Sequence, residues 1–459
     1  MNIVVLNGSP KGELSVTLQY VRFAARKFPE HTFTIFPVAQ TIRKLEKDEK
    51  AFDDVINAVR AADAVLWSFP LYFLLVCSQY KRFIELIFER NAQAAFAGKY
   101  TASLSTSIHF FDHTAHNYIH AVCDDLAMRY LGAYSPAMFD LMKSKERSRW
   151  LSFVERFLDG AARRVPCARV YPPLAFPDFT YTPGPAAHPV DTAGKKILLL
   201  KDGRQPSGNT EALADALAAR FQGAAEVVNL MDIDIKGGCL GCCKCGLDNV
   251  CDYQGKDGFI DFYNEKVKKA DVVVFAGAIH DRYLSSRWKM FFDRSFFNTH
   301  TPTLIGKQIA FLISGPLGQI SNLRQILTAF GEFQEANLAG IVTDESADPT
   351  EIDALVTELA DALVHPAASG YAPPMTFLGV GGRRIFRDEV YGMLRFVFQS
   401  DHRYYKQHGL YDFPQKNYKA RRMNAFMMLL TRIPSVRKKF LKILPQQMVK
   451  PIKTVAETR

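Results

Sequence analysis

The chain has 459 residues, of which 48% are hydrophobic and 23% are charged. This balance is typical of folded globular proteins and excludes a disordered, collagen-like or disulfide-stapled chain. No apolar stretch approaches the roughly 18 residues needed to cross a bilayer. The opening residues, MNIVVLN, predict a buried strand and no signal peptide. We therefore expect a cytoplasmic protein of about three structural units.

The net charge of +10 is concentrated at the C-terminus. Residues 416–459 contain twelve Lys or Arg and one acidic residue, whereas the rest of the chain contains 45 basic and 46 acidic residues. A nearly neutral body does not support nucleic-acid binding, so no nucleic-acid partner is expected.

Predicted strands and helices alternate along most of the chain, which is typical of a parallel sheet covered by helices. In the first half, the apolar pattern predicts strands at 3–6, 33–38, 64–68 and 100–106 and helices at 16–28, 53–60, 79–90 and 117–129. In the second half, it predicts strands at 197–200, 226–230, 272–276, 308–314 and 337–342 and helices at 210–221, 286–297, 321–330 and 351–362.

The proline-rich stretch 176–194 predicts a linker between the two halves. The resulting domains are residues 1–175, a linker at 176–195, residues 196–370, and a C-terminal extension at 371–459. Within that extension, the glycines at 379–382 are expected to form a turn, with an anion-binding nest as the alternative.

The two halves match each other in sequence. Residues 61–67, AADAVLW, resemble residues 269–275, KADVVVF, and each half carries a Lys 18 positions after the Asp of this segment, at Lys81 and Lys289. The equal spacing predicts an internal duplication, in which one chain forms a covalent pseudo-dimer. Two unrelated α/β domains with similar patterns are the alternative.

A polar turn follows the first predicted strand and leads into a helix. Residues 7–17, NGSPKGELSVT, combine the free N–H groups of a helix start with the hydroxyl side chains of Ser9, Ser15 and Thr17. Such a turn suits a phosphate group. A tight turn with a serine N-cap is the alternative.

Two further loops follow strands at the same edge of the predicted sheet. Residues 68–75, SFPLYFLL, place Pro70 and Tyr72 beside the crevice where such sheets bind ligands, and residues 105–109, STSIH, form the third loop. A proline turn with Tyr72 in the core would explain the second loop alone. Three polar loops at one edge favour a ligand site.

In these elements the first half resembles the flavodoxin-like NAD(P)H-dependent FMN reductases: Gly8-Ser9-Pro10, Ser15-x-Thr17 and Pro70-x-Tyr72. The resemblance implies two tandem flavodoxin-like α/β domains with doubly wound parallel sheets. It implies that the phosphate of FMN would be held by Ser9, Lys11, Ser15, Val16 and Thr17. It also implies that the isoalloxazine ring would be lined by Pro70, Leu71, Tyr72, Phe73, Thr106, Ser107 and His109.

The second half departs from this pattern. Its first loop, residues 202–210, keeps Gly-Asn-Thr but lacks Gly-Ser-Pro, and its second loop has Ala-Ile-His at 278–280. Asp202 would repel a phosphate unless Arg204 compensates for its charge. We therefore expect the second half to be a degenerate copy without FMN.

Five of the eight cysteines lie within thirteen residues. The spacing Cys-x2-Cys-x2-Cys-x5-Cys at Cys239, Cys242, Cys245 and Cys251 favours the four ligands of a [4Fe-4S] cluster. Structural zinc, which more often uses two separated knuckles, and redox-active thiols are the alternatives. Cys243 is the unassigned member.

A cysteine run in an FMN reductase-like domain resembles the iron–sulfur flavoproteins. In that family the cluster of one protomer lies near the flavin of its partner, so the resemblance implies that first-half FMN would exchange electrons with a second-half cluster. Weak candidates for proton transfer are His109, His280 and Tyr283, with His113 and His116 near the third loop.

The basic C-terminal tail, residues 416–459, has apolar residues at helical spacing opposite Lys and Arg. Such a tail can contact the inner face of a membrane, pack on the protein body, or dock an acidic electron carrier. A homodimer is a further expectation for the assembly.

Together these features predict an FMN- and [4Fe-4S]-dependent oxidoreductase that passes electrons between NAD(P)H, or a ferredoxin-type carrier, and an unidentified acceptor. One alternative is an NAD(P)H-dependent flavin or quinone reductase with a structural zinc. Another is a non-enzymatic, membrane-docked scaffold with degenerate flavodoxin folds.

Overall fold

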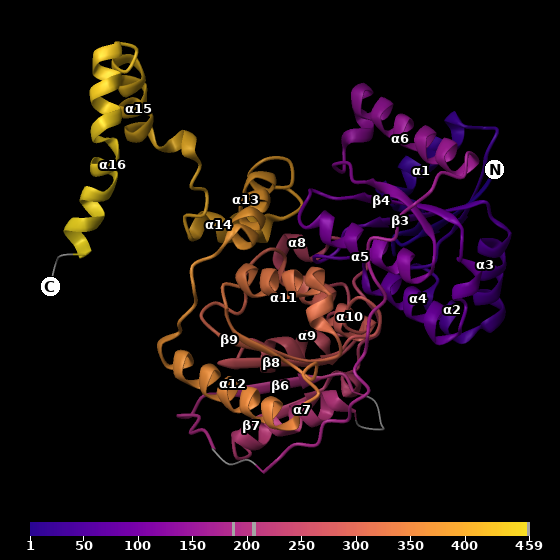
Figure 1. The fold of residues 1–459 in the computed structure, drawn as a ribbon, viewed down its shortest axis with the longest axis horizontal. Helices are drawn as coiled ribbons and strands as arrows, with labels where there is room; N and C mark the ends of the chain where they lie inside the picture. Colours follow the sequence, from indigo (N-terminus) through magenta and orange to yellow (C-terminus); the bar gives the residue numbers. More distant parts are fainter. Residues whose placement is uncertain (186–188, 204–207, 457–459) are drawn as a thin grey trace. The chain divides into compact units, whose positions relative to one another are not determined.

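Two five-stranded parallel sheets form the core of the protein (Figure 1). The computed structural model describes residues 1–185, 189–203 and 208–456. The strand order is β2-β1-β3-β4-β5 in the first sheet and, from the matching edge, β7-β6-β8-β9-β10 in the second. Both orders are that of the flavodoxin-like doubly wound fold. The expected pair of tandem α/β domains is therefore confirmed.

Five strands form each sheet. They are β1 (Asn2–Asn7), β2 (Thr32–Phe36), β3 (Ala64–Pro70), β4 (Tyr100–Thr106), β5 (Arg129–Tyr134), β6 (Ile197–Lys201), β7 (Ala225–Asn229), β8 (Val272–Ala278), β9 (Gln308–Ser314) and β10 (Asn337–Thr343).

The helices alternate with these strands. In the first domain they are α1 (Val16–Lys27), α2 (Ile42–Lys47), α3 (Glu49–Ala61), α4 (Ser78–Glu89), α5 (Asp112–Asp125) and α6 (Ser144–Ala162). In the second domain they are α7 (Asn209–Arg220), α8 (Cys245–Asp248), α9 (Phe259–Phe262), α10 (Ser286–Ser295), α11 (Ser321–Phe333) and α12 (Pro349–Ser369). The C-terminal helices are α13 (Phe377–Tyr391), α14 (Gln399–Gln407), α15 (Tyr418–Leu430) and α16 (Pro434–Ala456).

Alternating side chains of each central strand build a separate core on each face of its sheet. Ile3 and Val5 of β1 pack with α1 and α6. In the second domain, Ile197 and Leu199 of β6 pack with α7 and α12 in the same way. Because strand side chains point to opposite faces in turn, the other face of each sheet is left for the helices that meet the neighbouring domain.

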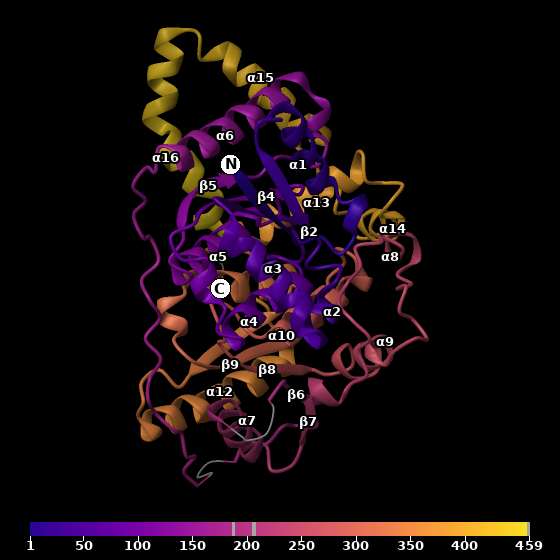
Figure 2. The same cartoon turned by 90° about the vertical axis from the view of Figure 1, so that its right-hand side faces the viewer.

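The two domains meet through α4 and α10, which lie side by side in both views (Figures 1 and 2). Helices α5 and α11 also meet, and the Asn322 amide donates to the carbonyl of Thr114 over 3.0 Å. Equivalent helices of the two domains thus face each other, as in the interface of a symmetric dimer.

Three first-domain elements, α2, β5 and α6, were missing from the sequence-based predictions. Strand β5 lies at the sheet edge, and most of its side chains are only partly buried, so it lacks the continuous apolar run of a central strand. Helix α6 covers the first sheet through a core that includes Trp150 and Phe157.

The chain divides into two compact units, Met1–Arg403 and Tyr404–Arg459. The start of the C-terminal extension therefore belongs to the unit that contains both sheets. The expected glycine turn or nest at 379–382 is wrong, because these residues lie inside α13. A Cβ atom at Gly382 would lie 2.5 Å from the Phe110 ring, so the missing side chain lets the helix approach the first domain closely. No helix of the described residues is long and apolar enough to cross a membrane.

Candidate functional site

The turn between β1 and α1 is held by its own polar side chains. The Asn7 amide oxygen accepts from the N–H of Ser9 over 3.1 Å, and the Ser9 hydroxyl accepts from the N–H of Lys11 over 3.3 Å. Ser15 caps α1 by accepting from the N–H of Leu18 over 3.3 Å. Each hydroxyl keeps its own proton for a ligand, and the first N–H groups of a helix have no partner within that helix.

The turn at residues 7–17 and the loop at residues 105–109 are linked through two threonine side chains. The hydroxyls of Thr17 and Thr106 lie 2.6 Å apart, and both residues are buried. Lys11 and Val16, in contrast, are exposed to solvent. The predicted phosphate residues therefore surround the start of α1, with buried hydroxyls below and a lysine at the surface.

The second loop is a tight turn at the end of β3. Tyr72 and Leu75 exchange two backbone hydrogen bonds of 2.8 and 3.0 Å, and Leu71 donates to the carbonyl of Thr106 over 3.3 Å. Pro70, Leu71 and Tyr72 thus lie beside the third loop. Phe73 is directed elsewhere, because its ring contacts Phe330 and Phe333 of α11 at centroid distances of 6.0 and 6.2 Å.

Unpaired polar atoms mark this edge of the first sheet. Among the described residues, the Asn7 amide nitrogen, the Ser68 hydroxyl and the Tyr72 hydroxyl are buried without a hydrogen-bond partner. An unpaired buried polar group costs about 1–3 kcal/mol. The site therefore fits a ligand that is itself rich in donors and acceptors, and FMN has this chemistry.

The cysteine loop of the second domain, residues 237–251, packs against the first domain beside the turns predicted to bind FMN. The Gln79 amide donates to the carbonyl of Cys239 over 3.1 Å. Gly241 has φ +63°, and a Cβ atom there would overlap the Tyr72 hydroxyl and lie 3.0 Å from Cε of Lys11. The loop is therefore in contact with two residues predicted to hold FMN.

A buried ion pair fixes the start of the cysteine loop. The Arg294 guanidinium donates to both carboxylate oxygens of Asp257 over 2.8 and 3.0 Å and to the carbonyl of Gly237 over 2.9 Å. The end of the loop is held by the Ser400 hydroxyl, which donates to the carbonyl of Gly246 over 3.0 Å. Sequence reasoning missed these supporting residues, because no local motif connects residues 257, 294 and 400 with the cysteines.

The cysteines of the loop differ in exposure: Cys245 is buried, Cys242 is exposed, and the others are partly buried. Burial raises the pKa of Cys245 to about 12, with further increases from Cys251, Cys242 and Cys243. The sulfur of Cys239 accepts from the N–H of Gly241 over 3.4 Å. Within the described parts of the chain, no three His, Cys, Asp or Glu side chains converge tightly enough to hold a metal ion.

In the second domain, carboxylates accept hydrogen bonds from the loops at the corresponding edge of the sheet. Glu211 accepts from the N–H of Gly208 over 3.0 Å, and Asp344 accepts from the N–H of Gly315 over 2.8 Å. Asp202 accepts from the Ser285 hydroxyl, and burial raises the pKa of this carboxyl. The Gly208 N–H at the start of α7 is therefore already occupied by Glu211. Arg204, the expected compensating charge, lies outside the described residues.

The linker between the domains contacts the start of α7 at the same edge of the second sheet. The Asn209 amide donates to the carbonyl of Phe179 over 2.9 Å, and its oxygen accepts from the N–H of Tyr181 over 2.9 Å. Tyr181 is buried in the core of the second domain. Asn209 of the Gly-Asn-Thr motif is therefore engaged by the linker.

The candidate proton donors have different surroundings. His109 is half exposed, and its hydrogen bond to Asp112, 2.9 Å long, raises its pKa. His116 is buried between the hydroxyls of Ser103 and Ser105 at 2.7 and 2.8 Å, and burial lowers its pKa to about 4. His116 is consequently neutral at pH 7 and cannot supply a proton readily.

The other two candidates belong to the second domain. His280 is exposed, and its imidazole interacts electrostatically with Asp202 of its own domain. Tyr283 is fully buried, with its ring 6.5 Å from that of Tyr118, and burial raises its pKa. Among the described residues, neither His280 nor Tyr283 forms a hydrogen bond or ring contact with the turns at 7–17, 68–75 and 105–109.

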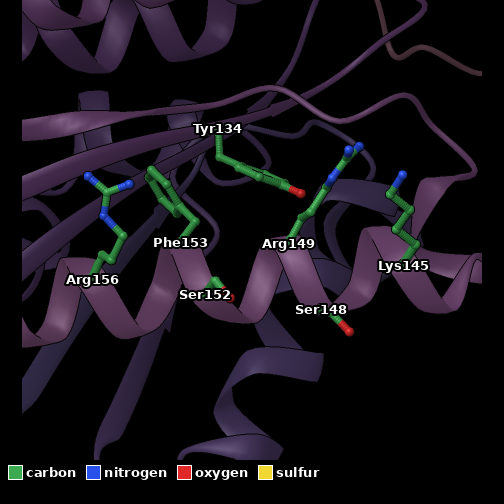
Figure 3. A pocket seen from close by; sticks show the side chains of 7 residues that line it. All are labelled: Tyr134, Lys145, Ser148, Arg149, Ser152, Phe153 and Arg156. Carbon is green, nitrogen blue, oxygen red and sulfur yellow. The ribbon is translucent and has the colours of Figure 1, made fainter.

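A hollow of about 640 Å³ lies between β5 and α6, away from these loops (Figure 3). Its lining is formed by Tyr134, Lys145, Ser148, Arg149, Ser152, Phe153 and Arg156. None of these is a predicted site residue. Arg149 forms an ion pair of 2.8 Å with Glu146 beside the hollow.

Comparison with known families gives a match over both domains. The sequence profile described as NADPH-dependent FMN reductase matches residues 1–138 and 195–343. A comparison with curated proteins gives no match.

Three solved structures similar to this chain each match 34–38% of its length. Apo NADH:FMN oxidoreductase (EMOB) is 18% identical, with 34% of this chain and 87% of that chain covered and a TM-score of 0.29. RosB, solved with 8-demethyl-8-formylriboflavin-5'-phosphate, is 16% identical, with 38% and 80% covered and a TM-score of 0.32. FerB of Paracoccus denitrificans, an NAD(P)H:acceptor oxidoreductase, is 17% identical, with 35% and 97% covered and a TM-score of 0.30.

Proposed function

The chain belongs to the NADPH-dependent FMN reductase family, and from this premise we propose that it is an iron–sulfur flavoprotein-type oxidoreductase with FMN in the first domain and a [4Fe-4S] cluster on the cysteine loop. The observation that carries the proposal is the contact of Gly241 with Tyr72 and Lys11. It joins the loop that would hold the cluster to the loops that would hold the flavin. When bound, FMN accepts a hydride or single electrons, and a cluster passes electrons singly.

The residues that would bind the FMN phosphate are those around the start of α1. Ser9, Ser15 and Thr17 would donate hydroxyl protons, Val16 and Thr17 would donate backbone N–H groups, and Lys11 would supply positive charge. Pro70, Leu71, Tyr72, Thr106, Ser107 and His109 would surround the ring. Phe73, which packs on α11, would support the turn from behind.

The residues that would bind the cluster are Cys239, Cys242, Cys245 and Cys251. Structural zinc more often uses two separated cysteine knuckles than one continuous run. A cluster spreads its irons over several corners and accepts thiolates from a wider ring. The N–H of Gly241 that donates to Cys239 would also stabilise the thiolate charge. The spacing Cys-x2-Cys-x2-Cys-x5-Cys in one continuous run therefore favours a cluster over zinc.

We further propose that the chain arose by tandem duplication and works as a covalent pseudo-dimer. Asp63 accepts from the N–H of Asn2 over 2.7 Å, and Asp271 accepts from that of Lys196 over 2.9 Å, so the matched aspartates have the same role. The pairing of flavin loops with a cysteine loop then needs one chain only. A homodimer would be an additional level of assembly.

The proposed donors are NAD(P)H or a ferredoxin-type carrier. The family is NADPH-dependent, and His109, exposed at the rim of the third loop with its pKa raised by its hydrogen bond to Asp112, is placed to hold a proton there.

The decisive experiment is anaerobic purification followed by quantitation of FMN, iron, sulfide and zinc. We expect one FMN per chain together with iron and sulfide, and bleaching of the brown chromophore by NAD(P)H or reduced ferredoxin. Cys245→Ser should abolish iron binding and leave FMN in place. Cys167→Ser, outside the loop, is the matched control and should retain both.

Two other outcomes would contradict the proposal and favour a different function. Stoichiometric zinc without iron would indicate a flavin or quinone reductase with a structural zinc. Protein that takes up neither flavin nor iron on reconstitution would indicate a scaffold.

A further inference from the structure

Helices α15 and α16 make up most of the C-terminal unit, Tyr404–Arg459, and they bury very few apolar side chains. Helices α15 and α16 cover most of residues 418–456. Among the side chains described between Lys406 and Ala456, none is buried. Helices of a globular protein gain most of their stability by burying an apolar face. Within the C-terminal unit, the apolar side chains of α15 and α16 are left uncovered.

The uncovered apolar side chains of α16 form a row. Leu441, Met448, Ile452 and Val455 are 56, 66, 69 and 74% exposed. They recur at spacings of seven, four and three residues, which places them on one face of a helix. Helix α15 adds Met423, Phe426, Met428 and Leu429, all exposed.

The segment that contains these two helices is also strongly basic. Residues 416–456 contain eleven Lys or Arg and no Asp or Glu. On α16, Lys439 and Lys442 project roughly 100–160° away from Leu441 when each residue advances the helix by about 100°. The apolar row thus has a cationic flank, whereas the remainder of the chain is nearly neutral.

We propose that α15 and α16 form a docking surface for a bilayer rich in anionic lipid. The apolar row would enter the boundary between headgroups and acyl chains, and the lysines would meet lipid phosphates. An acidic protein would match the charge but would leave a long row of flexible Met, Leu, Ile and Val side chains without a shaped partner. Both helices would lie in the interface, since no described helix can cross a membrane.

The proposal is tested by sedimentation of the full-length protein with vesicles. Phosphatidylcholine vesicles are compared with vesicles that contain one-third phosphatidylglycerol, at about 0.1 M and about 1 M salt, where the Debye length falls from about 10 to about 3 Å. We expect binding to the anionic vesicles only, weakened at high salt.

Two groups of variants separate the charged and apolar contributions. The combined Lys438→Gln, Lys439→Gln and Lys442→Gln variant should bind roughly a hundredfold more weakly, since each basic residue near an anionic surface contributes about 1 kcal/mol. Met448→Gln with Ile452→Gln should also weaken binding, and this loss should persist at low salt. The matched control, Lys44→Gln with Lys47→Gln and Lys50→Gln, removes three exposed lysines of the first domain and should bind normally.

Three results would overturn the lipid assignment: no sedimentation with anionic vesicles, equal weakening by the control, or binding unaffected by the apolar variants. The last would indicate a purely electrostatic surface, as for an acidic protein. Far-ultraviolet circular dichroism and FMN content of each variant verify that the sheets are intact.

Discussion

The backbone N–H of Ser78 donates to the carboxylate of Asp293 over 2.7 Å, although 215 residues separate the two in the sequence. The reverse contact is also present, because the N–H of Ser286 donates to Glu85 over 2.5 Å. Helices α4 and α10 therefore cap each other across the domain boundary. Ser78 and Ser286, like Glu85 and Asp293, are 208 positions apart. This reciprocity joins the two flavodoxin-like domains and holds the cysteine loop against the first.

Breaking one of these reciprocal caps should destabilise the paired domains. Glu85→Gln removes a buried carboxylate that lies 2.8 Å from the ammonium of Lys81. We expect a loss of about 3–5 kcal/mol in the free energy of unfolding, typical of a broken buried ion pair. Urea unfolding at neutral pH measures it. Glu89→Gln, on the same helix but half exposed, should cost less than about 1 kcal/mol, and equal losses would contradict the interpretation.

The stability of the first domain should fall between pH 6.5 and 4 because of His116. Burial lowers its pKa from 6.5 to about 4, so the unfolded chain binds a proton over this range while the folded chain does not. By linkage, stability is lost as the pH falls through this window, by up to about 3 kcal/mol. Urea unfolding at several pH values measures the slope.

His116→Gln should flatten this slope, even though it also lowers stability at neutral pH. His365→Gln, at an exposed position of α12, is the control and should keep the slope of the unmodified protein. An unchanged slope in His116→Gln would show that another group titrates.

Gly241→Ala should disrupt the contact between the cysteine loop and the first-domain turns that we propose bind FMN. The new methyl group would overlap the Tyr72 hydroxyl at a positive φ, so we expect weaker FMN retention and loss of iron. Quantitation of both cofactors checks this.

Gly255→Ala is the matched control for backbone strain. Gly255 also has a positive φ, +72°, but a Cβ atom there would meet nothing within 4 Å. It should keep both cofactors. If the two variants lose them equally, backbone strain and not the contact with Tyr72 is responsible.

Thr17→Val should weaken FMN binding roughly ten- to a hundredfold, because hydrogen bonds to charged groups contribute about 1.5–3 kcal/mol. Thr210→Val, at the corresponding position of the second domain, should leave binding unchanged, since carboxylates and the linker fill that site. Quenching of flavin fluorescence during titration measures both affinities. A second FMN lost in Thr210→Val would show that the second domain binds flavin as well.

The sequence by itself determined every strand except β5, the parallel arrangement of the strands and the three polar loops. Apolar runs and turn residues act locally, and every predicted strand is present in the sheets. The family match over residues 1–138 and 195–343 agrees with the resemblance stated from the loop motifs. The cysteine spacing also depends on the sequence alone, and its ligand assignment remains a prediction.

Only the tertiary structure decided which surfaces meet. The contact between Tyr72 and Gly241 joins positions 169 residues apart and depends on the docking of α4 on α10, which no local pattern encodes. The same holds for the turning of Phe73 toward α11, the closure of the second site by the linker, and the helix at 379–382. The physical reason is that periodicity and turn chemistry fix the conformation of neighbouring residues, whereas contacts between distant segments follow from how completed helices and sheets bury their remaining apolar faces.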